Sequence, residues 1–189
     1  MAANKRDSIL KAALQLFAER GYDGTTVPMI ADRAQVGAGT IYRYFENKES
    51  LVNGLFQSCV KEFADTLHFD ALHSKEDIRE QFHFIFQRLV AFADNNLLAL
   101  LFIDSHNSAY YLDQESKKVF EELLGTFRQV ILNGKKAGMI KDFDINALIA
   151  LVYGAYVQIF KLISAGILTE TRELLAGVEE SCWDAVRVI

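Results

Sequence analysis

The chain has 189 residues, of which 51% are hydrophobic, so it can bury a sizeable core in one or two domains, and a largely disordered chain is excluded. The formal net charge is −5, but residues 1–50 hold seven Lys or Arg against six Asp or Glu, so the acidic excess lies after residue 50. The N-terminal part is only weakly basic, which excludes tight non-specific binding to nucleic acid.

A single proline and the absence of alternating strand patterns predict an all-α fold. We expect the first helix to start at Asp7 or Ser8 and to stop at Gly21, a residue that tolerates the left-handed conformation of helix ends. Its buried stripe follows the period of an amphipathic helix: Ile9, Ala12, Ala13, Leu16 and Phe17.

Residues 25–51 predict two short helices, a tight turn between them and the start of a longer helix. Thr26 can cap the first by accepting a backbone N–H, and Pro28 suits a first helical turn. In the second, Ile41 and Phe45 share an inward face because they are four residues apart. Its other side chains are of the types that contact phosphates and base edges: Thr40, Tyr42, Arg43 and Tyr44.

Longer helices fill the rest of the chain, and with the first three they make about nine. We expect them at about 47–67, 77–94, 97–103, 113–136, 145–165 and 170–188. Residues 69–75 form a looser segment, and the polar residues 94–96 interrupt the helical pattern. Residues 147–157 are apolar on all sides, which in a soluble protein indicates a helix buried on more than one face.

The N-terminal motifs stand at a recognisable spacing: Thr26-Val27, Ile30-Ala31, Gly39-Thr40-Ile41-Tyr42-Arg43-Tyr44-Phe45 and Lys48-Glu49-Ser50-Leu51. This segment resembles the helix-turn-helix of TetR-family transcriptional regulators, and residues 17–22 resemble the end of that family's first helix. The resemblance covers about the first fifty residues. It implies a helix-turn-helix DNA-binding domain at 1–50, followed by a helical regulatory and dimerisation domain at 51–189.

The resemblance also implies which residues bind DNA: Thr26, Arg33, Gly39, Thr40, Tyr42, Arg43, Tyr44 and Lys48. Arg43 is the candidate for a base contact, because a guanidinium can bind guanine O6 and N7 together. The tyrosines, Thr26 and Lys48 would bind the DNA backbone, and Gly39 would let that backbone approach the helix start.

Three positions depart from the family's pattern. Gln35 stands where glycine is common, Gly37 where serine often caps the helix, and Ala38 where lysine is frequent. Specificity should therefore depend more strongly on Arg43. Arg33 either compensates for the missing lysine or is a solvated surface arginine.

The family's regulatory domain encloses an apolar ligand pocket among the middle helices, which here are rich in aromatic residues. Most such residues are simply core. The candidates for a ligand site are Phe63, Phe86, Phe102, Asp104, His106, Tyr110, Phe127 and Tyr153. These residue types suggest a small hydrophobic effector with one polar end.

The last two predicted helices are candidates for a dimer interface. Small residues that permit close helix approach occur in the first of them: Ala147, Ala150, Gly154 and Ala155. Pairing with a second copy is the economical explanation, and burial within one thick monomer is the alternative. The family's dimer, which resembles a four-helix bundle, favours the homodimer.

Cysteine usage and the N-terminus indicate the compartment. Cys59 and Cys182 form no metal-binding or Cys-x-x-Cys motif, so reduced, buried thiols are the simplest interpretation and redox sensing is the alternative. No apolar segment follows the charged start, so we expect no signal peptide. The longest apolar run, 147–157, is shorter than the ~20 residues that span a bilayer. We therefore expect a soluble cytoplasmic protein with no membrane partner.

No arrangement of residues predicts an enzyme, a metal site or a cofactor. His68 and His73 have no carboxylate or thiol at metal-ligand spacing, and no catalytic triad or phosphate-binding glycine loop occurs. The leading hypothesis is a dimeric repressor that a small hydrophobic ligand releases from a palindromic operator. In the alternative, the larger domain is a protein-interaction module without such an effector. An enzyme that depends on His106 or Asp104 is the least supported hypothesis.

Overall fold

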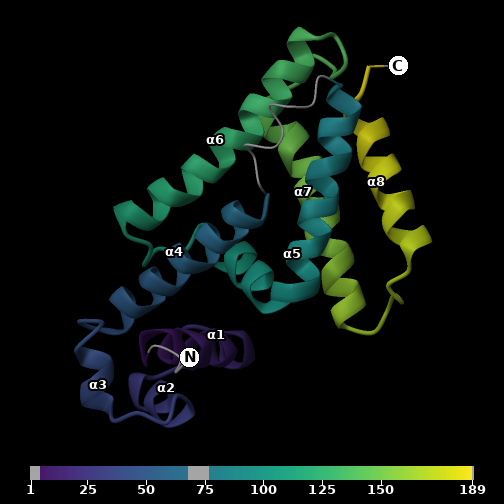
Figure 1. Cartoon of the computed structure of the whole chain (residues 1–189). Coiled ribbons are helices and arrows are strands. Elements are labelled where there is room, and N and C mark those ends of the chain that lie inside the picture. The colour runs from purple at the N-terminus through teal and green to yellow at the C-terminus, as the bar shows by residue number, and fades with distance from the viewer. Residues whose placement is uncertain (1–4, 68–76, 189) are drawn as a thin grey trace. The chain divides into compact units, whose positions relative to one another are not determined.

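The computed structural model describes residues 5–67 and 77–188, and within them the chain is helical, which confirms the predicted fold class (Figure 1). The helices are α1 (Lys5–Arg20), α2 (Val27–Arg33), α3 (Ala38–Tyr42), α4 (Lys48–Leu67), α5 (Ile78–His106), α6 (Gln114–Lys136), α7 (Ile145–Ser164) and α8 (Arg172–Val186). The predicted loose segment 69–75, together with His68 and His73, lies outside the described residues.

Helix α5 accounts for the difference between the nine helices expected and the eight that the described residues contain. Its backbone leaves helical geometry at Asn96, where φ is −138° and ψ is 38°, so α5 consists of two helical segments joined by a kink. Just before the kink, the Asn95 side chain donates to the Ala91 carbonyl at 2.8 Å and thus competes for a helical acceptor. The predicted interruption at 94–96 is therefore a kink and not a loop.

Polar side chains cap helix starts, among them those of α4, α7 and α8. Asp144 caps α7 by accepting a hydrogen bond from the amide three residues further on. Thr171 caps α8 by accepting from the Leu174 amide at 3.1 Å. At the start of α4, the Ser50 amide donates to Asn47 Oδ1 at 2.8 Å and the Asn47 amide donates to Ser50 Oγ at 3.1 Å. This reciprocal pair is a capping box, so the start of α4 is well defined.

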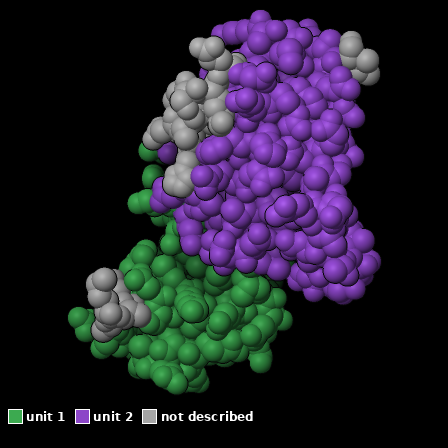
Figure 2. All heavy atoms as spheres, turned by 45° about the vertical axis from the view of Figure 1, so that its right-hand side comes forward, with its two compact units in different colours: residues 1–61, 98–120 green, residues 62–97, 121–189 purple. Residues whose placement is uncertain are grey.

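The chain forms two compact units (Figure 2). Unit 1 comprises residues 1–61 and 98–120, and unit 2 comprises residues 62–97 and 121–189. The chain therefore passes from one unit to the other three times: within α4, just after the kink of α5 and within α6. The functional boundary expected between residues 50 and 51 stays a prediction.

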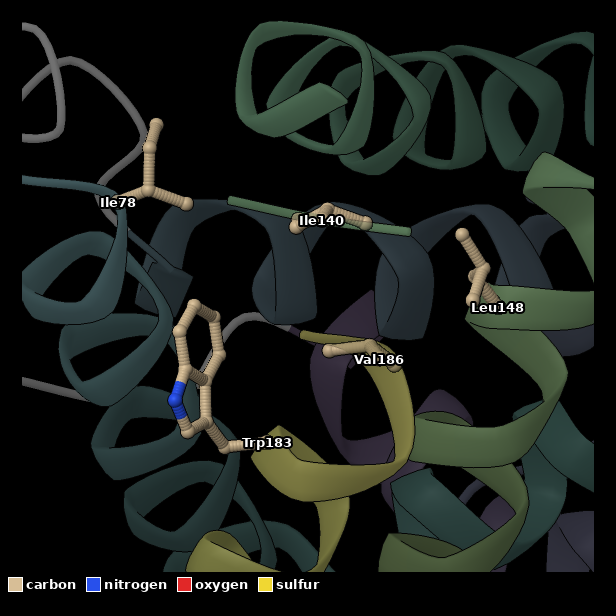
Figure 3. Close-up of a cluster of buried hydrophobic side chains, with 5 residues drawn as sticks. All are labelled: Ile78, Ile140, Leu148, Trp183 and Val186. Atoms are coloured by element: carbon tan, nitrogen blue, oxygen red, sulfur yellow. The ribbon is translucent and has the colours of Figure 1, made fainter. Parts of the chain in front are cut away.

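A cluster of buried side chains forms part of the core of unit 2. Its members come from α5, the segment after α6, α7 and α8, and they are Ile78, Ile140, Leu148, Trp183 and Val186 (Figure 3). Next to it, the Lys141 amide donates to the Val186 carbonyl at 3.0 Å, and the Val188 amide donates to the Met139 carbonyl at 2.9 Å. This short antiparallel bridge ties the end of α8 to the segment that follows α6.

Helix α7 buries only part of its apolar surface within the single chain. Its buried residues are Leu148, Tyr156, Val157 and Phe160. By contrast, the Leu151 side chain is 49% exposed, and Gly154, one turn further on, is also exposed. The single chain therefore does not provide the burial on several faces that the sequence predicts.

Two helices among the described residues, α5 and α7, are long and apolar enough to cross a membrane by length and composition alone. The run 147–157 alone is too short to span a bilayer, but the apolar character of α7 continues over 20 residues. Core helices of soluble proteins meet the same criteria, so length and composition do not assign either helix to a membrane.

Gly134 of α6 lies too close to the core cluster for a side chain. A Cβ at this position would lie 2.5 Å from Ile140 Cδ1 and 2.8 Å from Ile140 Cγ1. Overpacking costs about 1–3 kcal/mol, so Gly134→Ala should lower the free energy of unfolding by that amount in urea denaturation. Gly125 on the same helix would meet nothing within 4 Å, so Gly125→Ala should instead stabilise the chain by about 0.5–1 kcal/mol. Equal effects of the two changes would contradict this packing.

Candidate nucleic-acid interface

A buried threonine closes the corner between α1 and α2. Gly21 follows α1 with a φ of +68°, and its amide donates to the Phe17 carbonyl at 2.9 Å, which confirms the predicted helix end. The fully buried Thr25 hydroxyl has the carbonyls of Gly21 at 2.8 Å and Leu16 at 3.1 Å within reach, and its one proton is shared between these two acceptors. Carbonyls at the end of α1 are thereby paired. The stripe predicted for α1 is buried: Ile9, Ala12, Ala13, Leu16 and Phe17.

Helix α2 begins at the predicted cap. Thr26 is extended, and its side chain accepts a hydrogen bond from the Met29 amide at 3.5 Å, while Pro28 occupies the first turn. The residues that α2 buries are Val27, Ile30 and Ala31. Helix α2 contacts both α1 and α3, so these three helices form one packed group.

The turn between α2 and α3 contains a strained glutamine. Gln35 has a φ of +55°, in the left-handed region that residues other than glycine adopt at a cost. Its amide donates to the Asp32 carbonyl at 3.1 Å, and the Val36 amide donates to the Ala31 carbonyl at 3.0 Å. Backbone hydrogen bonds therefore hold the turn in a conformation that suits glycine, the residue common at this position of the TetR pattern.

Helix α3 and the turn that follows it bury the pair of residues predicted to face inward and expose two tyrosines and an arginine. Ile41 is 1% exposed and Phe45, just after the helix, is 6% exposed. On the outside, Tyr42 is 56% exposed, Tyr44 is 42% exposed, and Arg43 between them is also exposed. This arrangement offers one charged group and two hydroxyls to phosphates and base edges.

The start of α3 is open. Gly37 caps it without a side-chain hydrogen bond, and the Thr40 amide donates to the Gly37 carbonyl at 2.8 Å. A Cβ at Gly39 would meet no atom of the described chain within 4 Å. A DNA backbone could therefore approach this end closely, which is the role expected of Gly39.

Lys48, at the start of α4, is engaged within the protein. Its ammonium donates to the carbonyls of Tyr22 at 2.9 Å and Thr25 at 3.1 Å, and it lies 3.9 Å from the centroid of the Tyr22 ring. That ring stacks on Tyr111 with centroids 4.0 Å apart, and burial raises the pKa of Tyr111 to about 12. Lys48 thus joins α4 to the corner between α1 and α2. Since an ammonium has three donors, its predicted phosphate contact would use the third.

Arg33 is paired with α1. Its guanidinium donates to both carboxylate oxygens of Glu19 at 2.9 Å, and this hydrogen bonding lowers the pKa of Glu19. The pair is exposed, and exposed pairs are weak, so a DNA phosphate could compete for the guanidinium. The expected DNA contact of Arg33 therefore stays a prediction, with Glu19 as its competitor.

The predicted ligand-binding residues divide between the two units. Those in unit 1 are Phe102, Asp104, His106 and Tyr110, and those in unit 2 are Phe63, Phe86, Phe127 and Tyr153. In unit 1, the His106 ring is buried 4.1 Å from the Phe102 centroid and 6.4 Å from that of Phe17 in α1. Burial lowers the pKa of His106, which favours the neutral ring. Tyr110, in contrast, is 82% exposed.

Three of the four candidates in unit 2 lie beside other aromatic rings. Phe63 stacks on Phe92 with centroids 4.5 Å apart, and the Phe86 centroid lies 6.4 Å from that of Phe82. Tyr153 lies beside Tyr156, at 6.1 Å between centroids. Such contacts are also typical of core packing, so a ligand role for these residues stays a prediction.

Sequence reasoning missed a pair of buried polar residues in unit 1. Asn53 is 4% exposed and Ser116 is fully buried, and the Ser116 hydroxyl donates to Asn53 Oδ1 at 2.7 Å. The local signal for Asn53 was its position among apolar neighbours such as Val52 and Leu55, which are themselves buried. No local pattern could connect it with a serine 63 residues away.

The described residues contain no group of three His, Cys, Asp or Glu side chains that could hold a metal ion. Cys59 and Cys182 are both buried. Burial also raises the pKa of the Cys182 thiol, which disfavours the reactive thiolate that redox sensing would need.

Helices α1 to α3 and the start of α4 thus form a helix-turn-helix with an exposed polar face, which defines a DNA-binding protein. The family described as "Bacterial regulatory proteins, tetR family" matches residues 9–55. "Tetracyclin repressor-like, C-terminal domain" matches residues 56–188. The chain belongs to the TetR family of transcriptional regulators.

Relatives and a solved structure agree with this assignment. The uncharacterized HTH-type transcriptional regulator YhgD of Bacillus subtilis (strain 168) is 30% identical over 146 residues, which cover 76% of each chain. The fatty acid metabolism regulator protein of the same strain is 28% identical over 150 residues, or 77% of this chain and 76% of its own. The structure of FadR from Bacillus subtilis in complex with stearoyl-CoA shares the fold, with a TM-score of 0.73 and 22% identity over 94% of this chain and 95% of that one.

Replacing Gln35 by glycine should stabilise the protein. The change removes a left-handed conformation that costs about 1–2 kcal/mol, and the greater freedom of glycine in the unfolded chain offsets about 0.5–1 kcal/mol of this gain. We expect Gln35→Gly to raise the free energy of unfolding by about 0.5–1 kcal/mol in urea denaturation. Gln35→Ala keeps the Cβ and should give no such gain. If both variants are equally stable, the turn is not strained.

Proposed function

We propose that this TetR-family regulator is a homodimeric repressor that binds a palindromic operator and leaves it when a small hydrophobic ligand occupies the larger domain. The observation that carries the DNA-binding part is the exposed Tyr42-Arg43-Tyr44 surface beside the buried residues that fix α3. Such a regulator would act in the cytoplasm, where it meets its operator. The relatives are named as regulators, and enzymatic activity forms no part of the proposal.

Within the operator, Arg43 reads sequence and its neighbours set the register. Arg43 is exposed, so its planar guanidinium can lie against a guanine edge in the major groove. Tyr42, Tyr44 and Thr40 reach phosphates, and Gly39 leaves room for the backbone. Thr26 and Arg33 contact phosphates from α2, as Lys48 does from α4.

The base contact of Arg43 can be tested directly. Loss of a bidentate pair with guanine costs about 1–3 kcal/mol, so Arg43→Ala should weaken operator binding and relax the preference at one base pair of each half-site. Fluorescence anisotropy with the selected operator and single-base variants measures both effects. Lys136→Ala, which removes one exposed positive charge at the end of α6, should change neither. An unchanged base preference in Arg43→Ala would refute the assignment.

The proposed homodimer uses α7 and α8. Leu151 and Gly154 leave an apolar strip of α7 at the surface, and Gly177 of α8 is exposed as well. Exposed small residues allow two helices to approach closely, and a symmetric dimer would bury such a strip against its own copy. Two-fold symmetry would also place the two DNA-binding domains, one from each subunit, on the two halves of a palindrome.

A charge placed in this strip should separate the subunits. An unpaired buried charge costs about 2–5 kcal/mol, so Leu151→Glu should raise the dimer dissociation constant at least about 30-fold. Sedimentation equilibrium measures it, and circular dichroism shows that the variant is folded. Leu132→Glu on α6 makes the same change at a residue that is 36% exposed, and it should leave the dimer intact. A Leu151→Glu chain that stays dimeric would place the interface elsewhere.

The proposed effector is a hydrophobic molecule with a polar end, of which a long-chain acyl thioester is an example. Two comparisons support this class: one relative is a fatty acid metabolism regulator, and one structure that shares the fold is a complex with stearoyl-CoA. The proposed lining residues within unit 2 are the four candidates Phe63, Phe86, Phe127 and Tyr153. Mutual stacking, such as that of Phe63 on Phe92, favours the competing proposal of a protein-interaction module with a filled core.

A thermal-shift experiment separates these two proposals. At 100 times its dissociation constant a ligand stabilises the native state by about 2.7 kcal/mol, so stearoyl-CoA should raise the melting temperature by several degrees and displace the operator. Coenzyme A without an acyl chain is the control and should have neither effect. No shift across a panel of acyl-CoA thioesters and fatty acids would favour the interaction module.

A further inference from the structure

The buried amide of Asn53 uses its full hydrogen-bonding capacity. Its Nδ2 donates to the carbonyls of Glu49 at 2.8 Å and Tyr111 at 2.9 Å. Its Oδ1 accepts from the Asp113 amide at 2.9 Å and the Ser116 hydroxyl at 2.7 Å. An asparagine offers two donors and two lone pairs, so every position is occupied and the amide has one orientation.

The partner residues of Asn53 are fixed as well. The Ser116 hydroxyl gives its proton to Asn53 and accepts a hydrogen bond from Gln57 Nε2 at 3.0 Å. The Ser116 amide donates to Asp113 Oδ1 at 2.7 Å, so the same group of residues also caps the start of α6. We call this group, Asn53, Gln57, Tyr111, Asp113 and Ser116, the Asn53 network. It connects residues 53–57 of α4 with residues 111–116, and both segments belong to unit 1.

Other contacts within unit 1 are between aromatic rings. Phe17 and Phe102 have centroids 6.0 Å apart, and Phe56 and Phe120 are also 6.0 Å apart. Ring contacts tolerate small sliding movements, because the hydrophobic effect has no direction. A saturated set of hydrogen bonds allows only one register, and buried polar groups serve this purpose in other proteins.

The same part of α4 carries the DNA-reading helices. Lys48, five residues before Asn53, holds the corner between α1 and α2 through two carbonyls. Phe45, which follows α3, lies against Gly54, where an added Cβ would be 3.0 Å from its ring. The direction of the first turns of α4 therefore sets the direction of α3.

We infer that Asn53 is a positioning residue for DNA recognition, which fixes the reading helices to residues 98–120 in the one register that fits the operator. This inference rests on the proposed function. A variant without the Asn53 network would keep a folded helix-turn-helix, but its orientation would vary. The half-sites of an operator must match the separation of the two helix-turn-helix domains of the dimer. Such a variant would therefore bind its operator more weakly, and its affinity would also depend less on the spacing between the half-sites.

The test compares Asn53→Ala with Val60→Ala. Val60 lies on α4 in unit 1 and is fully buried, but it has no hydrogen-bonding side chain. An operator is first selected from random DNA with the wild-type chain, and binding is then measured under conditions in which circular dichroism shows each variant to be folded. When both variants are folded, Asn53→Ala should bind the operator at least about tenfold more weakly than Val60→Ala, whatever their melting temperatures.

A second measurement separates positioning from stability. Moving the half-sites apart by one base pair should cost the wild type and Val60→Ala about tenfold in affinity, but Asn53→Ala less than about threefold. If Asn53→Ala does not fold, Ser116→Ala is used, which removes one hydrogen bond of the Asn53 network and should shift both readouts in the same direction.

Two different results would overturn the inference. If the wild type selects no operator, the proposed function fails, and the role of Asn53 in it fails too. If an operator is selected but Asn53→Ala matches Val60→Ala in affinity and in spacing dependence, only the positioning role is wrong.

Discussion

A helix of five residues is too short to be stable in water, and α3 is that short, so its shape depends on what surrounds it. Ile41 and Phe45 attach its inner side to unit 1, and the turn at Gln35 sets where it begins. Behind it, the Lys48 ammonium holds the carbonyls of Tyr22 and Thr25. The exposed side chains Tyr42, Arg43 and Tyr44 are therefore available for contacts outside the protein, because buried residues hold the segment in place.

Local features of this fold were predictable, and contacts between distant residues were not. The Thr26 cap, the Gly21 helix end and the inward pair Ile41 and Phe45 follow from spacing within a few residues, and all are confirmed. The DNA-binding residues remain predictions, because exposed side chains show their role only against DNA. His106 illustrates what sequence could not supply: its packing against Phe17 joins residues 89 positions apart.

The low net charge of the DNA-binding segment is reduced further in effect by contacts within the protein. Residues 1–50 carry a net charge of only +1, and two of their cations, Arg33 and Lys48, already have partners inside the protein. The acidic residues of this segment and these internal contacts both weaken a non-specific attraction to phosphates. In the proposed dimer, useful affinity would come from two heads bound to one operator at high effective concentration, which favours selectivity over strength.

The way in which the chain divides into units limits how such regulators can be recombined. Unit 1 takes residues from two separate stretches, 1–61 and 98–120, and the hydrogen bonds of Asn53 run between them. A chimera that joins residues 1–50 of this chain to the larger domain of a relative would bring Lys48 but leave both Asn53 and Ser116 behind. Exchange of DNA specificity between relatives by a single crossover would thus work only where the recipient supplies a compatible pair at these two positions.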